Sequence, residues 1–106
     1  MRYTLYLLHF NNPVERNGVK FQHYLGYTSL PLEERLERHR KGQGSLWVRW
    51  LLANGAKDFI VAFTQFFSTQ QEARQREISL KKRMGKHLCP LCKINEKLDK
   101  EAKDNG

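Results

Sequence analysis

The segment from Phe21 to Gly42, FQHYLGYTSLPLEERLERHRKG, most constrains the fold of this chain. Aromatic and aliphatic residues favour a strand over residues 21–27, and the Ser-Leu-Pro that follows suits the start of a helix. We expect this helix to end before Gly42, because glycine is common just after a helix. Within it, Arg35 and His39 are four positions apart, so they lie one above the other on the helix surface. The segment therefore predicts a strand, a turn and a helix that presents two basic side chains together.

The remaining hydrophobic patterns predict two further strands and two further helices. Residues 3–10 and 58–67 are apolar on both faces, which is typical of strands covered on both sides and would suit a central position for the later one. Between the two expected hairpin strands, Asn-Asn-Pro and Asn-Gly predict a long loop. The loop is expected over 11–20, and the helices over 46–53 and from about Thr69, a capping residue, to Met84.

Glu77 lies on the apolar stripe of the last predicted helix. It shares that stripe with Ala73 and Leu80, four residues before it and three after it. A carboxylate facing a core is costly unless a cation or hydrogen-bond donors meet it. Taken alone, Glu77 is explained as well by a position at the edge of the stripe or by an ion pair with one of two nearby arginines, Arg74 and Arg76.

Considered together, five short motifs of this chain resemble the GIY-YIG nuclease family. They are Thr4-Leu5-Tyr6 in the first strand, Tyr24-Leu25-Gly26 in the second, Arg35 and His39 four apart in the next helix, the junction HRKGQGS over 39–45, and Glu77 in a later helix. The resemblance covers roughly residues 3–84. The chain departs from the family pattern at Thr4, where a glycine is usual, and at Leu25, where an isoleucine is usual.

The resemblance implies an α/β fold with a small central three-stranded, antiparallel-containing sheet flanked by helices, in the order β-β-α-α-β-α. Residues 1–86 would form the nuclease domain. Residues 87–106 would form a short C-terminal extension with a Cys-x-x-Cys pair and a charged tail.

The resemblance also implies a magnesium-dependent endonuclease that hydrolyses phosphodiester bonds in DNA, in a setting such as repair or restriction. The catalytic residues would be Tyr6, Tyr24, Arg35, His39 and Glu77. Glu77 would hold Mg²⁺ or another divalent cation, and the family usually gives the role of general base to the first tyrosine. The assignment of base and relay among the two tyrosines and the histidine stays open. The alternative is a non-catalytic nucleic-acid-binding module that retains the fold.

The charge of the chain points to an anionic partner. Lys and Arg number 19 against 11 Asp and Glu, which gives a net charge of +8, and nucleic acid is the commonest partner of such a protein. We expect Arg35, Lys41 and Lys81 to contact DNA. No apolar run is long enough to span a membrane and no signal-peptide pattern is present, so we expect a cytoplasmic protein. Nothing in the sequence specifies an oligomeric state.

The Cys-x-x-Cys pair, Cys89 and Cys92, supplies half of a zinc site. A structural zinc normally takes four ligands, and His87 brings the local set to three at most. A fourth ligand would have to come from His9, His23 or a second subunit. The sequence therefore favours a pair of free thiols at the end of the domain, and a zinc site is the less favoured alternative.

Trp47 and Trp50 are three apart on the short predicted helix. They are most simply core residues. A role in stacking on unpaired bases is the alternative.

Overall fold

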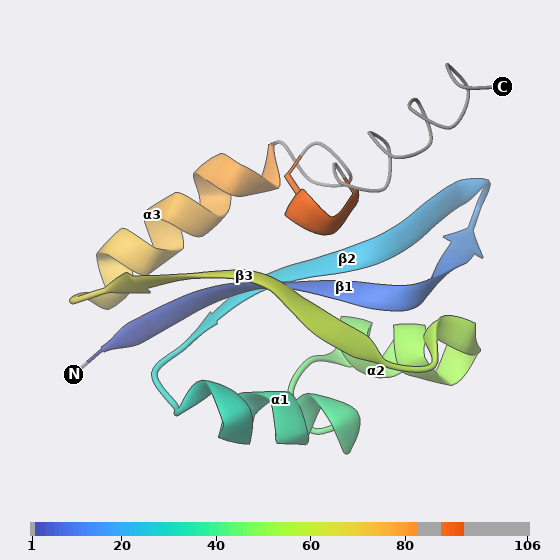
Figure 1. Ribbon diagram of the computed structural model, residues 1–106, viewed down its shortest axis with the longest axis horizontal. Coiled ribbons are helices and arrows are strands. Elements are labelled where there is room, and N and C mark those ends of the chain that lie inside the picture. Colours follow the sequence, from blue (N-terminus) through green and yellow to red (C-terminus); the bar gives the residue numbers. More distant parts are fainter. Residues whose placement is uncertain (1, 83–87, 93–106) are drawn as a thin grey trace, which may run out of the picture.

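A three-stranded antiparallel sheet lies between two helical layers in the computed structural model, which describes residues 2–82 and 88–92 (Figure 1). The predicted order of strands and helices is confirmed. The elements are β1 (Tyr3–Arg16), β2 (Val19–Thr28), α1 (Leu32–Arg40), α2 (Leu46–Leu51), the π-helical turn η1 (Leu52–Ala56), β3 (Phe59–Phe67) and α3 (Gln70–Lys81). The predicted charged tail over 93–106 lies outside the described residues.

The strand order is β2-β1-β3, so β1 is the central strand. Of the two alternatives expected for the strand at 58–67, central or well covered, the central position does not hold: β3 pairs only with β1 and lies at the edge of the sheet. Its apolar character comes instead from partial cover on its two faces by the two helical layers. Both neighbours of β1 are antiparallel to it.

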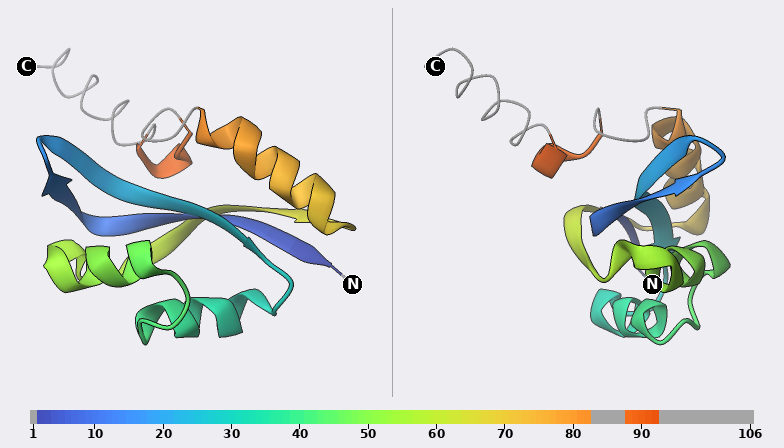
Figure 2. Two further views of the ribbon diagram at one scale, coloured as in Figure 1. Left: turned by 180° about the vertical axis from the view of Figure 1, so that it is seen from behind. Right: turned by 90° about the vertical axis from the view of Figure 1, so that its right-hand side faces the viewer.

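Alternate residues of β1 face two separate cores. Tyr6 and Leu8 belong to the core shared with α1 and α2, while Leu5 and Leu7 belong to the core shared with α3. All four are fully buried, and burying one such side chain contributes roughly 1.5–3 kcal/mol. Figures 1 and 2 show α1 and α2 on one face of the sheet, with α3 and the short turn at 88–92 on the other.

The prediction of a long loop over residues 11–20 is wrong, because the two strands continue to a tight turn at Asn17 and Gly18. These residues have φ of 53° and 80°, the left-handed values that an Asn-Gly hairpin turn requires. The Asn-Asn-Pro sequence is absorbed by an irregularity in the β1–β2 register between His9 and Val14. The hairpin therefore extends well beyond β3.

The helix ends follow their local signals. Gly42 adopts a φ of 76° just after α1, and the side chain of Thr69 accepts a hydrogen bond from the backbone N–H of Glu72 at the start of α3. The last residue of α3 is Lys81, earlier than expected, and Met84 lies outside the described residues. No helix in the described part of the chain is long and apolar enough to cross a membrane.

Candidate active site

A buried hydrogen-bonded chain joins β1 to α1. The hydroxyl of Tyr6 lies 2.7 Å from Nε2 of His39, and Nε of Arg35 donates to the same hydroxyl at 3.3 Å. Tyr6 and His39 are both fully buried. Leu32 and Leu36 pack α1 against the core of this face, which holds its basic side chains against β1. We call Tyr6, Arg35 and His39 the Tyr6 network.

His39 is neutral within this network. Burial, followed by the nearby positive charge of Arg35, lowers the pKa of His39 to about 4. Because Tyr6 accepts from Arg35, its own proton can be donated to Nε2 of His39, which places the imidazole proton on Nδ1. That Nδ1 has no hydrogen-bond partner among the described residues. A Cβ at Gly44 would come within 2.6 Å of it, so the loop after α1 needs a glycine there.

Tyr6 is protonated in this environment. Burial raises the pKa of Tyr6 to about 12, although the hydrogen bond from Arg35 lowers it and the charge of Glu77 adds a smaller increase. Burial also lowers the pKa of Arg35, but its interactions with Tyr6 and Tyr24 outweigh burial and leave that pKa raised. A fixed positive charge therefore lies beside a phenol that holds its proton.

Gly26 allows the two tyrosines of the site to converge. It is the cross-strand partner of Tyr6 on β2. A Cβ at this position would lie 2.8 Å from the ring of Tyr24, 3.0 Å from the hydroxyl of Tyr6 and 3.1 Å from the hydroxyl of Tyr24. Both hydroxyl groups thus share the space over one glycine, which explains why the Tyr-Leu-Gly motif ends as it does.

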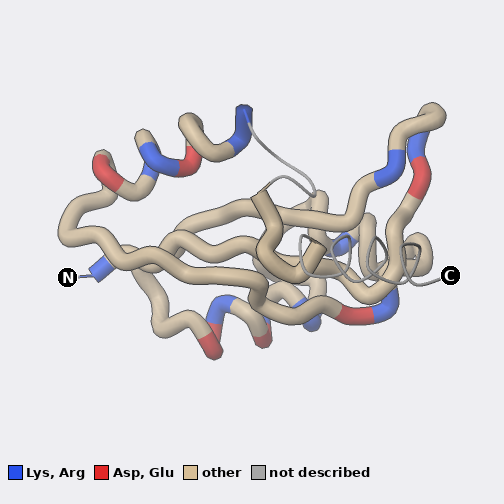
Figure 3. Tube along the Cα trace, turned by 45° about the horizontal axis from the view of Figure 1, so that its top comes forward, with Lys and Arg blue, Asp and Glu red and all other residues tan. Residues whose placement is uncertain are grey.

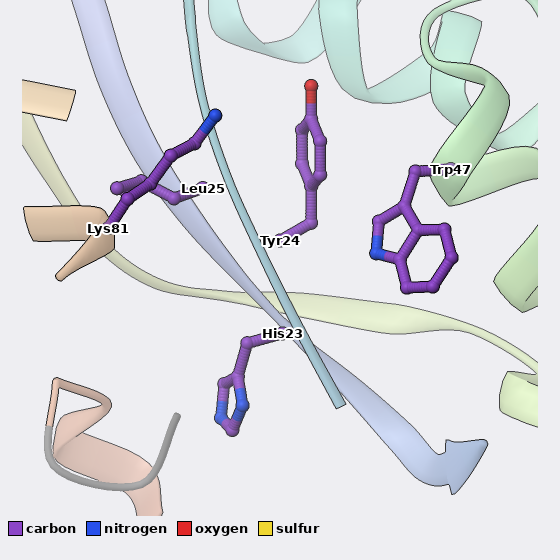
Figure 4. Close-up of a pocket in the computed structure, with 5 residues that line it drawn as sticks. All are labelled: His23, Tyr24, Leu25, Trp47 and Lys81. Carbon is purple, nitrogen blue, oxygen red and sulfur yellow. The ribbon is translucent and has the colours of Figure 1, made fainter. Parts of the chain in front are cut away.

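A pocket of about 390 Å³ opens beside Tyr24. Figure 4 shows Tyr24 on β2 between a lysine from α3 and an indole from α2. The pocket therefore receives side chains from both helical layers. Its lining residues are His23, Tyr24, Leu25, Trp47 and Lys81.

Glu77 approaches the site from the other helical layer. Its side chain is only 16% exposed, and its carboxylate lies 3.1 Å from Nζ of Lys81. The ion pair with Arg74 or Arg76 is therefore replaced by one with Lys81, a pocket residue. No hydrogen bond joins Glu77 to the Tyr6 network within residues 2–82 and 88–92, and its effect on Tyr6 is electrostatic.

Glu77 suits a hard divalent cation. Within the described residues, no other histidine, cysteine or acidic residue joins it in a group of three or more ligand atoms. Magnesium commonly binds one or two carboxylates and completes its shell with water and phosphate oxygens. A single, half-buried carboxylate beside a pocket matches that pattern.

The three residues expected to contact DNA occupy different environments. Lys81 lines the pocket, and Arg35 is directed inward to Tyr6 and to the carbonyl of Gly44. Lys41 is exposed at the end of α1, where it pairs with Glu37 at 3.1 Å. Figure 3 shows lysines and arginines on both helical layers and on the hairpin, interleaved with acidic residues.

The family model for the GIY-YIG catalytic domain matches residues 3–89. The chain belongs to the GIY-YIG family. Comparisons with curated proteins and with solved structures give no significant match. GIY-YIG domains are nuclease domains, generally endonucleases, and usually use a divalent metal. The resemblance inferred from the five motifs is confirmed, while the boundary at residue 86 stays a prediction.

One group of potential metal ligands in this GIY-YIG protein was considered from the sequence and disfavoured there. Ligand atoms of His9, His23, Cys89 and Cys92 lie within 4.8 Å of one another. The cysteine pair was expected to lack a fourth ligand, and the structure brings two histidines to it from β1 and β2. His87, the third ligand that the sequence suggested, lies outside the described residues. In the sequence, the Cys-x-x-Cys motif was the local signal, and His9 and His23 were candidates for a single fourth ligand.

Proposed function

We propose that this GIY-YIG protein is a magnesium-dependent endonuclease that hydrolyses phosphodiester bonds in DNA. The observation that carries the proposal is the buried Tyr6 network beside a pocket. Burying a histidine beside a partly buried arginine is costly, and a protein that only binds nucleic acid gains nothing from it. The same groups have a direct use where a proton moves and a phosphate gains charge.

The Tyr6 network can carry a proton in one direction. Tyr6 takes a proton from the attacking water as its own proton passes to Nε2 of His39, 2.7 Å away. Neutral His39 can accept that proton, and the relay avoids a free phenolate at a site where the pKa of Tyr6 is about 12. Tyr24, which lines the pocket, is the second candidate for the base.

Charge stabilisation falls to Arg35 and Glu77. The guanidinium of Arg35 offsets negative charge at the reacting phosphate, where a fixed cation is most effective in a site shielded from water. Glu77 would hold the magnesium ion, whose chemistry is to polarise the phosphate and steady the leaving oxygen. Tyr24 would position the attacking water from the pocket side.

The pocket supplies a path for the substrate backbone. Lys81 lies on one side of Tyr24. If the ammonium group of Lys81 paired with a DNA phosphate in place of Glu77, the carboxylate of Glu77 would be free to bind the cation. Trp47 forms another wall. Its ring is stacked on Trp50 with centroids 5.3 Å apart and planes at 7°, so it is rigid, and its half-buried face is suited to contact with a sugar or base.

The test is a cleavage assay with end-labelled duplex, branched and single-stranded DNAs, in magnesium and in excess chelator. We expect cleavage of at least one of these DNAs in magnesium and none with the chelator. DNA binding should weaken steeply as salt rises, because phosphate contacts release counterions.

Tight, salt-dependent binding to every DNA without cleavage of any would contradict the nuclease proposal. That outcome would support the alternative of a non-catalytic binding module. Cleavage that persists in excess chelator would instead contradict the role of the metal.

A further inference from the structure

Four potential metal ligands meet on the sheet face opposite the Tyr6 network. His9 and His23 are cross-strand partners on β1 and β2. Cys89 and Cys92 belong to the short turn that packs on the same face. Figure 4 shows His23 and Tyr24 directed to opposite sides of β2. We call these four residues the His–Cys cluster.

The spacing within the cluster matches the edges of a tetrahedron around zinc. Nδ1 of His9 lies 3.2 Å from Nε2 of His23 and 3.4 Å from Sγ of Cys89. Sγ of Cys92 lies 3.6 Å from the first of these nitrogens and 3.3 Å from the second. Zinc with ordinary bond lengths places two nitrogens about 3.3 Å apart, and a nitrogen and a sulfur about 3.6 Å apart.

Hydrogen bonding alone does not account for this convergence. A ring nitrogen offers either one proton or one lone pair in the plane of the ring. Nδ1 of His9 nevertheless meets three polar atoms, from His23, Cys89 and Cys92. A cation at the centre would satisfy all four ligand atoms at once.

The surroundings favour a closed structural site. Cys89 is fully buried, and the cluster borders a core that contains Leu5, Leu7 and Leu25. Polar atoms without good partners are costly in such surroundings.

We propose that His9 Nδ1, His23 Nε2, Cys89 Sγ and Cys92 Sγ bind one zinc ion. Two thiols lose their protons on binding, so the two thiolates neutralise the charge of the ion and two protons are released. All four positions are filled by protein, which leaves none for a substrate. The site is therefore structural and separate from the cation at Glu77.

The proposed zinc ties the end of the domain to its hairpin. His9 and His23 form the last regular pair before the β1–β2 register shifts, and Cys89 is 80 positions from His9 along the chain. Zinc would fix both the irregular part of the hairpin and the C-terminal turn. It would also support β2 at the residue next to Tyr24.

The direct test is the metal content of the full chain purified without added metal, measured by elemental analysis. We expect close to one zinc per chain, and almost none after Cys89 and Cys92 are both replaced by serine. His87→Gln is the matched control, because it removes the remaining nearby histidine and should keep the zinc. Cobalt exchanged into the site should give the intense visible spectrum of a tetrahedral centre with thiolate ligands.

A second measurement covers the case in which the double variant does not fold. Removing zinc from the unaltered protein with a strong chelator should lower its thermal midpoint, and zinc, but not magnesium, should restore it. His23→Gln should weaken zinc binding by at least tenfold. A metal-free chain, a disulfide between the two cysteines, or zinc lost in His87→Gln would overturn the proposal. None of these results depends on whether the protein cuts DNA.

Discussion

The two faces of β1 carry two polar clusters of different design. Tyr6 faces α1 in a chain of hydrogen bonds that includes a charged arginine and adjoins a pocket. His9, three residues later, faces the other way, and its ligand atom is one of four that lie within 4.8 Å of one another. An active site must keep room for substrate, whereas a structural metal site is best when the protein supplies every ligand. The comparison shows how one strand can serve both purposes.

The two clusters also differ in how they use histidine. His39 is neutral with its Nε2 against the hydroxyl of Tyr6, and in the proposed mechanism it takes the proton of that hydroxyl. His9 and His23 are arranged so that ring nitrogens of both point to the same place as two thiols. Changes in the Tyr6 network should therefore alter the chemical step, and changes in the His–Cys cluster should alter metal content and stability.

The largest effect expected on the catalytic face is that of Tyr6→Phe. The change keeps the ring in the core and removes only the oxygen that relays the proton, so the single-turnover rate should fall by about 10²–10⁴-fold. Tyr27→Phe on the opposite face is the matched control and should retain the parental rate. A Tyr6→Phe protein that cuts normally would move the base to Tyr24 or His39.

Arg35→Ala should reduce the chemical step by about 10²–10³-fold, and DNA affinity much less. The guanidinium contributes most when charge builds on the phosphate. Arg38→Ala removes an exposed arginine of the same helix that pairs with Glu34 at 3.4 Å, and it should leave the rate unchanged. A defect of Arg35→Ala in binding alone would make Arg35 a DNA anchor.

Gly26→Ala should lower the rate by roughly tenfold to a hundredfold. The new methyl group would lie 2.8 Å from the ring of Tyr24 and 3.0 Å from the hydroxyl of Tyr6. Because these distances are too short, one or both tyrosine side chains would have to move. Tyr24 is half-buried and can give way, so the loss of unfolding free energy should be small, about 1 kcal/mol. Cleavage kinetics and chemical unfolding of one preparation would separate the two effects, and an unchanged rate would show that the hydroxyl groups need not converge.

The smallest effect is a dependence of stability on pH that arises from His39. The pKa of His39 is about 4 in the folded protein, against 6.5 for an ordinary histidine, so between these pH values the unfolded chain binds the extra proton. The stabilisation is complete above pH 6.5 and is lost as pH falls toward 4, by at most about 3 kcal/mol. His39→Gln should reduce the slope of unfolding free energy against pH in this window. An unchanged slope would show that His39 is not held neutral.

The placement of Arg35, His39 and Glu77 was largely predictable from the sequence, and the convergence of the His–Cys cluster was not. The spacing of Arg35 and His39 on one helix is a local property, and the stripe of the last helix placed Glu77 inward. The cluster instead depends on which residue of β2 lies opposite His9. That register is set by the hairpin, whose outer part was predicted to be a long loop. Its cysteines then arrive from the far end of the chain.

The position of β3 and the partner of Glu77 were missed for related reasons. An apolar strand covered by helices on both faces carries the same pattern at the edge of a sheet as at its centre. Lys81 is four residues after Glu77, a spacing that favours an ion pair, but the sequence offered arginines that were closer along the chain. Side-chain competition of this kind is decided by three-dimensional packing.

The central claim is that Glu77 holds the cation for DNA cleavage, and its most direct test is a magnesium titration of single-turnover cleavage by Glu77→Gln. The control is Glu37→Gln, because Glu37 also pairs with a lysine four residues later at 3.1 Å but is exposed on α1. Each variant loses an ion pair with a lysine four residues later on its helix, and an exposed pair of this spacing is worth about 0.3–0.5 kcal/mol.

We predict that Glu77→Gln folds, binds DNA and retains its zinc, yet shows no cleavage at any magnesium concentration, while Glu37→Gln cuts at the parental rate. A Glu77→Gln protein that cuts DNA as well as its parent in magnesium would contradict the account.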